Sequence, residues 1–126
     1  MPHAERKEFN IMTAITRDTE LTPELIKELK NTYKKLYKTT LEGDVYIWHK
    51  LSRQDYKKLM KDYEDVDNQS ERLWAREEEA CRLSVVYPCQ EVLEEAMNNT
   101  AGMATMLSEE IYERSGFKVA EKTEEV

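Results

Sequence analysis

Thiol and imidazole side chains are the groups in this chain best suited to bind a transition metal. Cys81 and Cys89 are eight positions apart, whereas His3 and His49 lie far from them in sequence, a spacing unlike that of zinc sites. A disulfide is possible if the chain turns at Pro88, but two isolated cysteines in a chain without an expected secretion signal favour reduced packing residues. We therefore expect no metal and no cofactor.

Carboxylates could supply acid-base catalysis if their side chains converged. The acidic runs at 77–79, 94–95 and 109–110 instead place neighbouring carboxylates on different faces of a helix. Glu77 falls within an apolar stripe, and we expect its carboxylate to reach the edge of the stripe or to pair with a lysine. Motifs of phosphate loops, dinucleotide sites, serine hydrolases and zinc proteases do not occur. The sequence therefore predicts no catalytic residues and no enzyme.

An aromatic and basic segment, LYKTTLEGDVYIWHKLSRQDY at 36–56, could bind nucleic acid. Single strands stack their bases on aromatic rings within a positive groove. Residues 21–61 carry ten Lys/Arg against five Asp/Glu, but residues 62–126 carry six against seventeen, which would repel phosphates. A small nucleic-acid-binding regulator is therefore kept as an alternative, and nucleic acid is not the expected partner.

Length and composition limit the architecture that must position these residues. The 126 residues suit one domain with a modest core, and the chain is 40% hydrophobic and 36% charged, with a net charge of -7. Three glycines and three prolines supply few tight turns, which favours helices over a many-stranded fold. No segment has the roughly 18 to 20 apolar residues of a membrane span, so we expect no membrane contact.

A β-hairpin is predicted around Gly43, because a tight turn needs a residue that tolerates positive φ and the flanking residues favour strands. A two-residue loop at 42–43 or at 43–44 gives the same two faces. One face would hold Tyr37, Thr39, Leu41, Tyr46 and Trp48. The other would hold Leu36, Lys38, Thr40, Val45, Ile47, His49 and Leu51, and we expect its apolar residues to pack in the core.

Capping residues and apolar spacing predict four helices. The first begins at Thr22 and Pro23, and the second begins at Ser52 with a capping box to Asp55. The third runs from near Ser70 to Pro88 and should bury one stripe: Leu73, Trp74, Ala80, Cys81, Ser84 and Val85. The fourth runs from about 102 to 115 and ends at Gly116, with Phe117 folding back onto Tyr112. Residues 89–101 are expected to form a short helical turn and loop.

These elements predict a mainly helical α+β fold in a single domain: one helix, one hairpin, then three helices. Residues 1–20 are expected to form an N-terminal arm, which Phe9, Ile11, Met12 and Ile15 could anchor on the body. The globular domain should span 21–118, and an acidic tail should follow at 119–126.

Three segments together resemble small accessory proteins of tailed bacteriophages, which include tail assembly chaperones and baseplate or tail structural proteins. The segments are GDVYIWHKLSRQDYKKL at 43–59, VVYP at 85–88 and AGMATMLSEEIYERSGF at 101–117. The sequence departs from the family pattern at Cys89 and Gln90, where an acidic-polar pair is commoner, and in its extension through Glu20. The arm and the 89–100 loop therefore receive no transferred role.

The resemblance implies a helper that binds phage tail or baseplate proteins in the host cytoplasm, or a subunit retained in the virion tail. Self-association of the chain is kept as an alternative. If the apolar hairpin face packs in the core, the opposite face leaves aromatic rings for a partner, unless the arm or the first helix covers them. Methionines of the last helix could extend that surface. The expected partner-binding residues are Tyr37, Tyr46, Trp48, Met103 and Met106.

Overall fold

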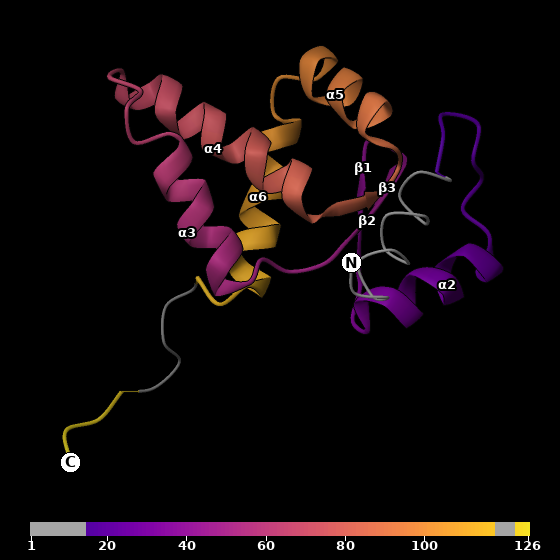
Figure 1. Cartoon of the computed structure of the whole chain (residues 1–126), viewed down its shortest axis with the longest axis horizontal. Coiled ribbons are helices and arrows are strands. Elements are labelled where there is room, and N and C mark those ends of the chain that lie inside the picture. Colours follow the sequence, from indigo (N-terminus) through magenta and orange to yellow (C-terminus); the bar gives the residue numbers. More distant parts are fainter. Residues whose placement is uncertain (1–14, 118–122) are drawn as a thin grey trace, which may run out of the picture.

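The computed structural model describes residues 15–117 and 123–126. Its fold is α+β and mainly helical, as the sequence predicted (Figure 1). Phe9, Ile11 and Met12 of the expected arm, and the start of the expected tail, lie outside the described residues. The elements, in chain order, are α2 (Pro23–Tyr33), β1 (Tyr37–Leu41), β2 (Asp44–Trp48), α3 (Arg53–Asp62), α4 (Gln69–Ser84), β3 (Val85–Tyr87), α5 (Gln90–Asn99) and α6 (Met103–Arg114).

A three-stranded antiparallel sheet, ordered β1-β2-β3, separates two apolar cores (Figure 1). One core lies between the sheet and helices α3 to α6, and its buried residues include Trp48, Leu59 and Leu107. The smaller core lies between the other face of the sheet and α2, and contains Leu29 and Ile47. Both faces of the sheet are therefore covered by helices.

The hairpin forms with the predicted faces. Leu41 pairs with Asp44 and Thr39 pairs with Tyr46, which places the loop at residues 42 and 43. Both loop residues have positive φ, 51° at Glu42 and 83° at Gly43, as a type I′ turn requires. The expectation that the aromatic face is exposed is wrong, because helices α3 to α6 pack over that face while α2 covers the other.

The predicted starts of α2 and α3 and the predicted end of α6 are confirmed. The Leu25 amide donates to Thr22 Oγ1 at 3.1 Å at the start of α2, and Ser52 and Asp55 form the expected reciprocal capping box of α3. At the end of α6, Gly116 has φ of 103° and the Phe117 amide donates to the Tyr112 carbonyl at 2.9 Å. The rings of Phe117 and Tyr112 meet edge to face, as the sequence predicted.

Two elements differ from the sequence prediction. The third helix ends at Ser84 rather than at Pro88, because residues 85–87 leave it to pair with β2 as strand β3. Residues 90–99 form a full helix, α5, rather than a turn and loop, so four helices follow the hairpin. Cys89 precedes α5 as its N-cap without a side-chain hydrogen bond, so the usual capping signal is missing there.

The described end of the N-terminal arm packs on the body. Ile15 is buried in the smaller core, as the sequence allowed. The Tyr87 hydroxyl donates to the Thr19 carbonyl at 3.0 Å, and the Arg17 guanidinium pairs with Glu91 and Glu95 on α5. The segment from residue 15 onward is thus held by contacts to α5 and β3.

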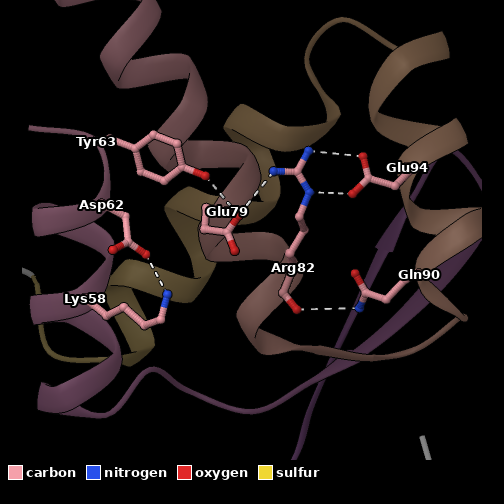
Figure 2. A network of polar contacts seen from close by, with 7 residues as sticks. All are labelled: Lys58, Asp62, Tyr63, Glu79, Arg82, Gln90 and Glu94. Carbon is pink, nitrogen blue, oxygen red and sulfur yellow. Dashed lines mark hydrogen bonds and ion pairs between the residues drawn. The ribbon is translucent and has the colours of Figure 1, made fainter. Parts of the chain in front are cut away.

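Arg82 connects α4 to its neighbours through a network of polar contacts (Figure 2). Its guanidinium makes two hydrogen bonds to the Glu94 carboxylate on α5 and one to Glu79, one turn earlier in α4. Glu79 in turn accepts a 3.0 Å hydrogen bond from the hydroxyl of Tyr63, the C-cap residue of α3. One arginine therefore helps to fix the positions of three helices.

Candidate protein-binding site

The aromatic residues expected to meet a partner are mostly in the core. Trp48 is 1% exposed, and its indole N–H donates to Thr39 Oγ1 at 2.9 Å. Tyr46 is buried as well, and half-buried Tyr37 stacks on Trp48 with a centroid distance of 4.7 Å. The prediction that Tyr46 and Trp48 lie at the surface is therefore wrong, because helices α3 to α6 pack against their side chains.

Three of the five expected partner residues still lie around one cleft. Tyr46, Met103 and Met106 line a hollow of about 670 Å³ between the hairpin loop and the facing ends of α5 and α6. Met103 is buried at its base, so its expected exposure is also corrected, whereas Met106 is 56% exposed. We name this surface the hairpin cleft. Two of the expected residues, Tyr46 and Met103, line it from buried positions, and Met106 is the accessible one.

A larger group of exposed apolar side chains lies on α4, where the sequence predicted core. Leu73 is 57% exposed and Trp74 is 58% exposed, although both belong to the stripe expected to be buried. Ala80 and Cys81, further along the same stripe, are fully buried. Helical spacing predicted the side of the helix that faces its neighbours, but it could not predict which part of that side borders a groove instead of the core.

Leu73 and Trp74 border a groove between α4 and α6. It consists of two adjoining hollows, of about 260 and 470 Å³, that share Glu77 and Thr105. Trp74 lines the smaller hollow, while Leu73 and the exposed ring of Phe117 line the larger one. We name this surface the α4–α6 groove; its lining residues are Leu73, Trp74, Glu77, Glu78, Met97, Ala101, Ala104, Thr105, Ser108, Glu109, Tyr112, Glu113 and Phe117.

Glu77 lies where the two hollows meet. It is 8% exposed, and its carboxylate accepts hydrogen bonds from Thr105 Oγ1 at 2.8 and 3.2 Å. The alternative in which Glu77 pairs with a lysine is wrong within the described residues, because no cation there forms an ion pair with its carboxylate. The Thr105 hydroxyl satisfies part of the hydrogen-bonding capacity of this nearly buried carboxylate but supplies no positive charge.

The arginines of α4 bond to groups outside the groove. Arg72 donates to the Val66 carbonyl at 2.9 Å and Arg76 donates to the Met60 carbonyl at 2.6 Å, so both bond to α3 and to the connection that follows it. Arg82 bonds to Glu79 and Glu94. In the described part of the chain, no lysine or arginine lines the groove, whereas four glutamates do. The groove is therefore apolar with an acidic border.

Tyr37 lies within a small basic surface formed with Lys35 and Arg114. Lys35 Nζ is 5.7 Å from the centroid of its ring, and Arg114 Cζ is 5.8 Å from it. Cations at these distances are attracted to the ring face. Because Tyr46 and Trp48 are buried, this surface offers a single ring of the three on which the nucleic-acid alternative depended.

The two cysteines differ in their surroundings. Cys81 is fully buried in α4, and burial raises the pKa of its thiol to about 12, with a further contribution from Glu77. Cys89 is partly exposed at the start of α5.

Because thiolates are the reactive species, we expect iodoacetamide at pH 8 to label Cys89 in the native protein and to leave Cys81 unmodified. Intact-mass spectrometry would show one adduct without denaturant and two in concentrated guanidinium. Cys89→Ser provides the matched control and should take up no label when folded. Rapid double labelling of the native protein would contradict the buried position of Cys81.

In the described part of the chain, no three His, Cys, Asp or Glu side chains converge to hold a metal ion. None of the helices described is both long enough and apolar enough to cross a membrane. Comparison of the chain with protein-family models, with curated proteins and with solved structures gave no match. The chemistry of the two surfaces themselves therefore carries the functional proposal.

Proposed function

We propose that the protein is a non-enzymatic helper that binds tail or baseplate proteins during bacteriophage assembly. The observation that carries this proposal is the α4–α6 groove, where Leu73, Trp74 and Phe117 are exposed together. Contiguous exposed apolar surface is characteristic of protein-interaction sites, and tryptophan is among the residues enriched there. The resemblance of three sequence segments to phage accessory proteins supplies the class of partner.

The mechanism is temporary covering of apolar surface. Tail proteins that will later be sheathed or assembled expose apolar helical stripes while they are free in the host cytoplasm, and such stripes aggregate. The groove would bury one of these stripes, and the net charge of -7 would keep the complex dissolved. The hairpin cleft, with Met106 at its edge, offers a second and more adaptable contact.

A retained virion subunit is the alternative within the same class, because a permanent subunit needs the same apolar surface. The composition of finished virions separates the two, since a chaperone leaves before assembly is complete. Nucleic-acid binding is disfavoured by the burial of Tyr46 and Trp48, which removes two of the three proposed stacking rings.

Affinity capture from nuclease-treated lysate of infected host cells tests the proposal, with mass spectrometry of both the captured proteins and the purified virions. We expect the tagged wild-type protein to retain an identified tail or baseplate protein. The double variant Leu73→Ala/Trp74→Ala should retain at least about tenfold less, because two central anchors contribute more than about 1.4 kcal/mol together.

Glu110→Ala is the control, since it truncates an exposed side chain of α6 that lines neither the groove nor the hairpin cleft. Equal capture by wild type and by the double variant would reject the groove as the binding surface. Loss of all tail proteins after nuclease treatment would reject the assembly role and favour nucleic-acid binding.

A further inference from the structure

We infer that the α4–α6 groove takes a cationic amphipathic helix of its partner, with one lysine or arginine of that helix bonded to Glu77. This inference rests on the proposed function and specifies the partner's chemistry. It follows from three properties of the groove: a nearly buried anion at its centre, apolar side chains on either side of that anion, and a border with a single sign of charge.

The central anion is Glu77, which both hollows share. Its carboxylate is held in place by Thr105 and, within the described residues, has no cationic neighbour at ion-pair distance. An incoming ammonium or guanidinium group would supply the missing charge and donate charge-assisted hydrogen bonds in a site already shielded from water. Trp74, which lines the adjacent hollow, can also receive a cation on its ring face.

The apolar parts of the groove determine the shape of the occupant. Along α6, the lining residues recur at three- and four-residue spacing from Ala104 to Glu113, a length of about 14 Å at 1.5 Å per residue. A groove of this length between two helices fits about two and a half turns of a third helix, at about 5.4 Å per turn. Leucines or isoleucines one turn before and after the cation would contact Trp74 at one end and Phe117 at the other.

Charge excludes an acidic occupant. The border carries Glu78, Glu109 and Glu113, and the arginines of α4 bond to groups outside the groove. A partner helix with lysines flanking its apolar stripe meets opposite charge along its whole length, whereas an acidic helix meets like charge. These rim contacts are exposed and will weaken with salt, while the contact with Glu77 will weaken less because it is buried.

The test uses two fluorescein-labelled synthetic peptides of fourteen residues with the same leucine stripe. One carries a central arginine and flanking lysines, and the other has glutamate at each of these positions. Fluorescence anisotropy with the full-length protein should give at least about tenfold tighter binding of the cationic peptide. Glu77→Gln should weaken that binding at least about fivefold, and Glu110→Gln, an exposed position on α6 outside the groove, should leave it unchanged.

A second variant, Glu109→Gln/Glu113→Gln, changes exposed positions of the groove border alone and should reduce the salt dependence of binding even if Glu77→Gln lowers stability. Equal affinity for both peptides, or unchanged affinity in Glu77→Gln and in the rim variant, would overturn the inference. A concentration-dependent dimer in sedimentation that Leu73→Ala/Trp74→Ala abolishes would also overturn it, by making a second copy the occupant. If tail proteins are captured through the groove but both peptides bind alike, the proposed function stands and the cationic partner is rejected.

Discussion

Trp48→Ala is expected to destabilise the fold by about 3 to 5 kcal/mol, the range for removing a large buried aromatic side chain. Trp48 is fully enclosed in the larger core, stacked on Tyr37 and hydrogen-bonded to Thr39. Small domains have about 5 to 15 kcal/mol of stability in total, so the variant should lose a large share of it. Urea unfolding followed by circular dichroism at 222 nm measures the difference.

Trp74→Ala is the matched control for Trp48→Ala because it removes the same side chain from an exposed position. Its free energy of unfolding should change by less than about 0.5 kcal/mol. The two tryptophans therefore separate stability from binding: Trp48 supports the core, and Trp74 faces the groove. A stable Trp48→Ala variant with impaired partner binding would restore the hairpin face as the interaction surface.

Arg82→Met is expected to destabilise the protein by about 1 to 2 kcal/mol at pH 7. The change removes the charge-assisted hydrogen bonds to Glu94 and Glu79 while keeping an unbranched side chain (Figure 2). The expected loss is at the lower end for charged hydrogen bonds because the side chain of Glu94 is 38% exposed, which weakens its pairing through solvent screening. Thermal unfolding of both proteins measures it.

The effect of Arg82→Met should depend on pH. The hydrogen bonds from the Arg82 guanidinium hold the pKa of the Glu94 carboxyl below its usual value, and the positive charge of Arg82 contributes to a smaller extent. A carboxyl whose pKa is lower in the folded state stabilises the fold above its unfolded pKa, and this contribution is lost as pH falls through the folded pKa. The stability difference between wild type and Arg82→Met should therefore be full at pH 7 and shrink below about pH 4.

Lys58→Met is the matched control, since it also replaces one cation by methionine. Lys58 makes an ion pair with Asp62 at 2.5 Å, but both side chains are exposed on the surface of α3. An exposed pair four residues apart on a helix contributes about 0.3 to 0.5 kcal/mol. Equal destabilisation by Lys58→Met and Arg82→Met would show that net charge matters more than the connection between helices.

The helix caps and the hairpin could be predicted because each depends on residues close together in sequence. Ser52 and Asp55 complete their capping box within one turn, and Gly43 fixes the hairpin loop by its own backbone geometry. The exact loop position stays open in the sequence, because 42–43 and 43–44 give the same faces, and the pairing of Leu41 with Asp44 shows that it is 42–43. Local chemistry thus accounts for most of the elements and for the mainly helical class.

Strand β3 and the exposure of α4 depend on contacts between segments far apart in sequence. Val85 is strand because it pairs with Trp48. The run of Val85, Val86 and Tyr87 before Pro88 favours a strand locally, but it is too short to outweigh the helical spacing that precedes it. Leu73 is exposed because it borders the α4–α6 groove instead of the core, which the period of the stripe does not reveal. The burial of Tyr46 and Trp48 also depends on distant segments, because the hairpin sequence alone does not show that helices α3 to α6 pack over its aromatic face.

The position of β2 between the two cores has a consequence for how the protein unfolds. Ile47 belongs to one core and its neighbours Tyr46 and Trp48 belong to the other. Opening either core exposes one face of the same strand, so we expect the loss of one core to destabilise the other. The backbone amides of β2 should accordingly exchange with deuterium through global unfolding alone, and the molecule should behave as one cooperative unit although it has two separate apolar interiors.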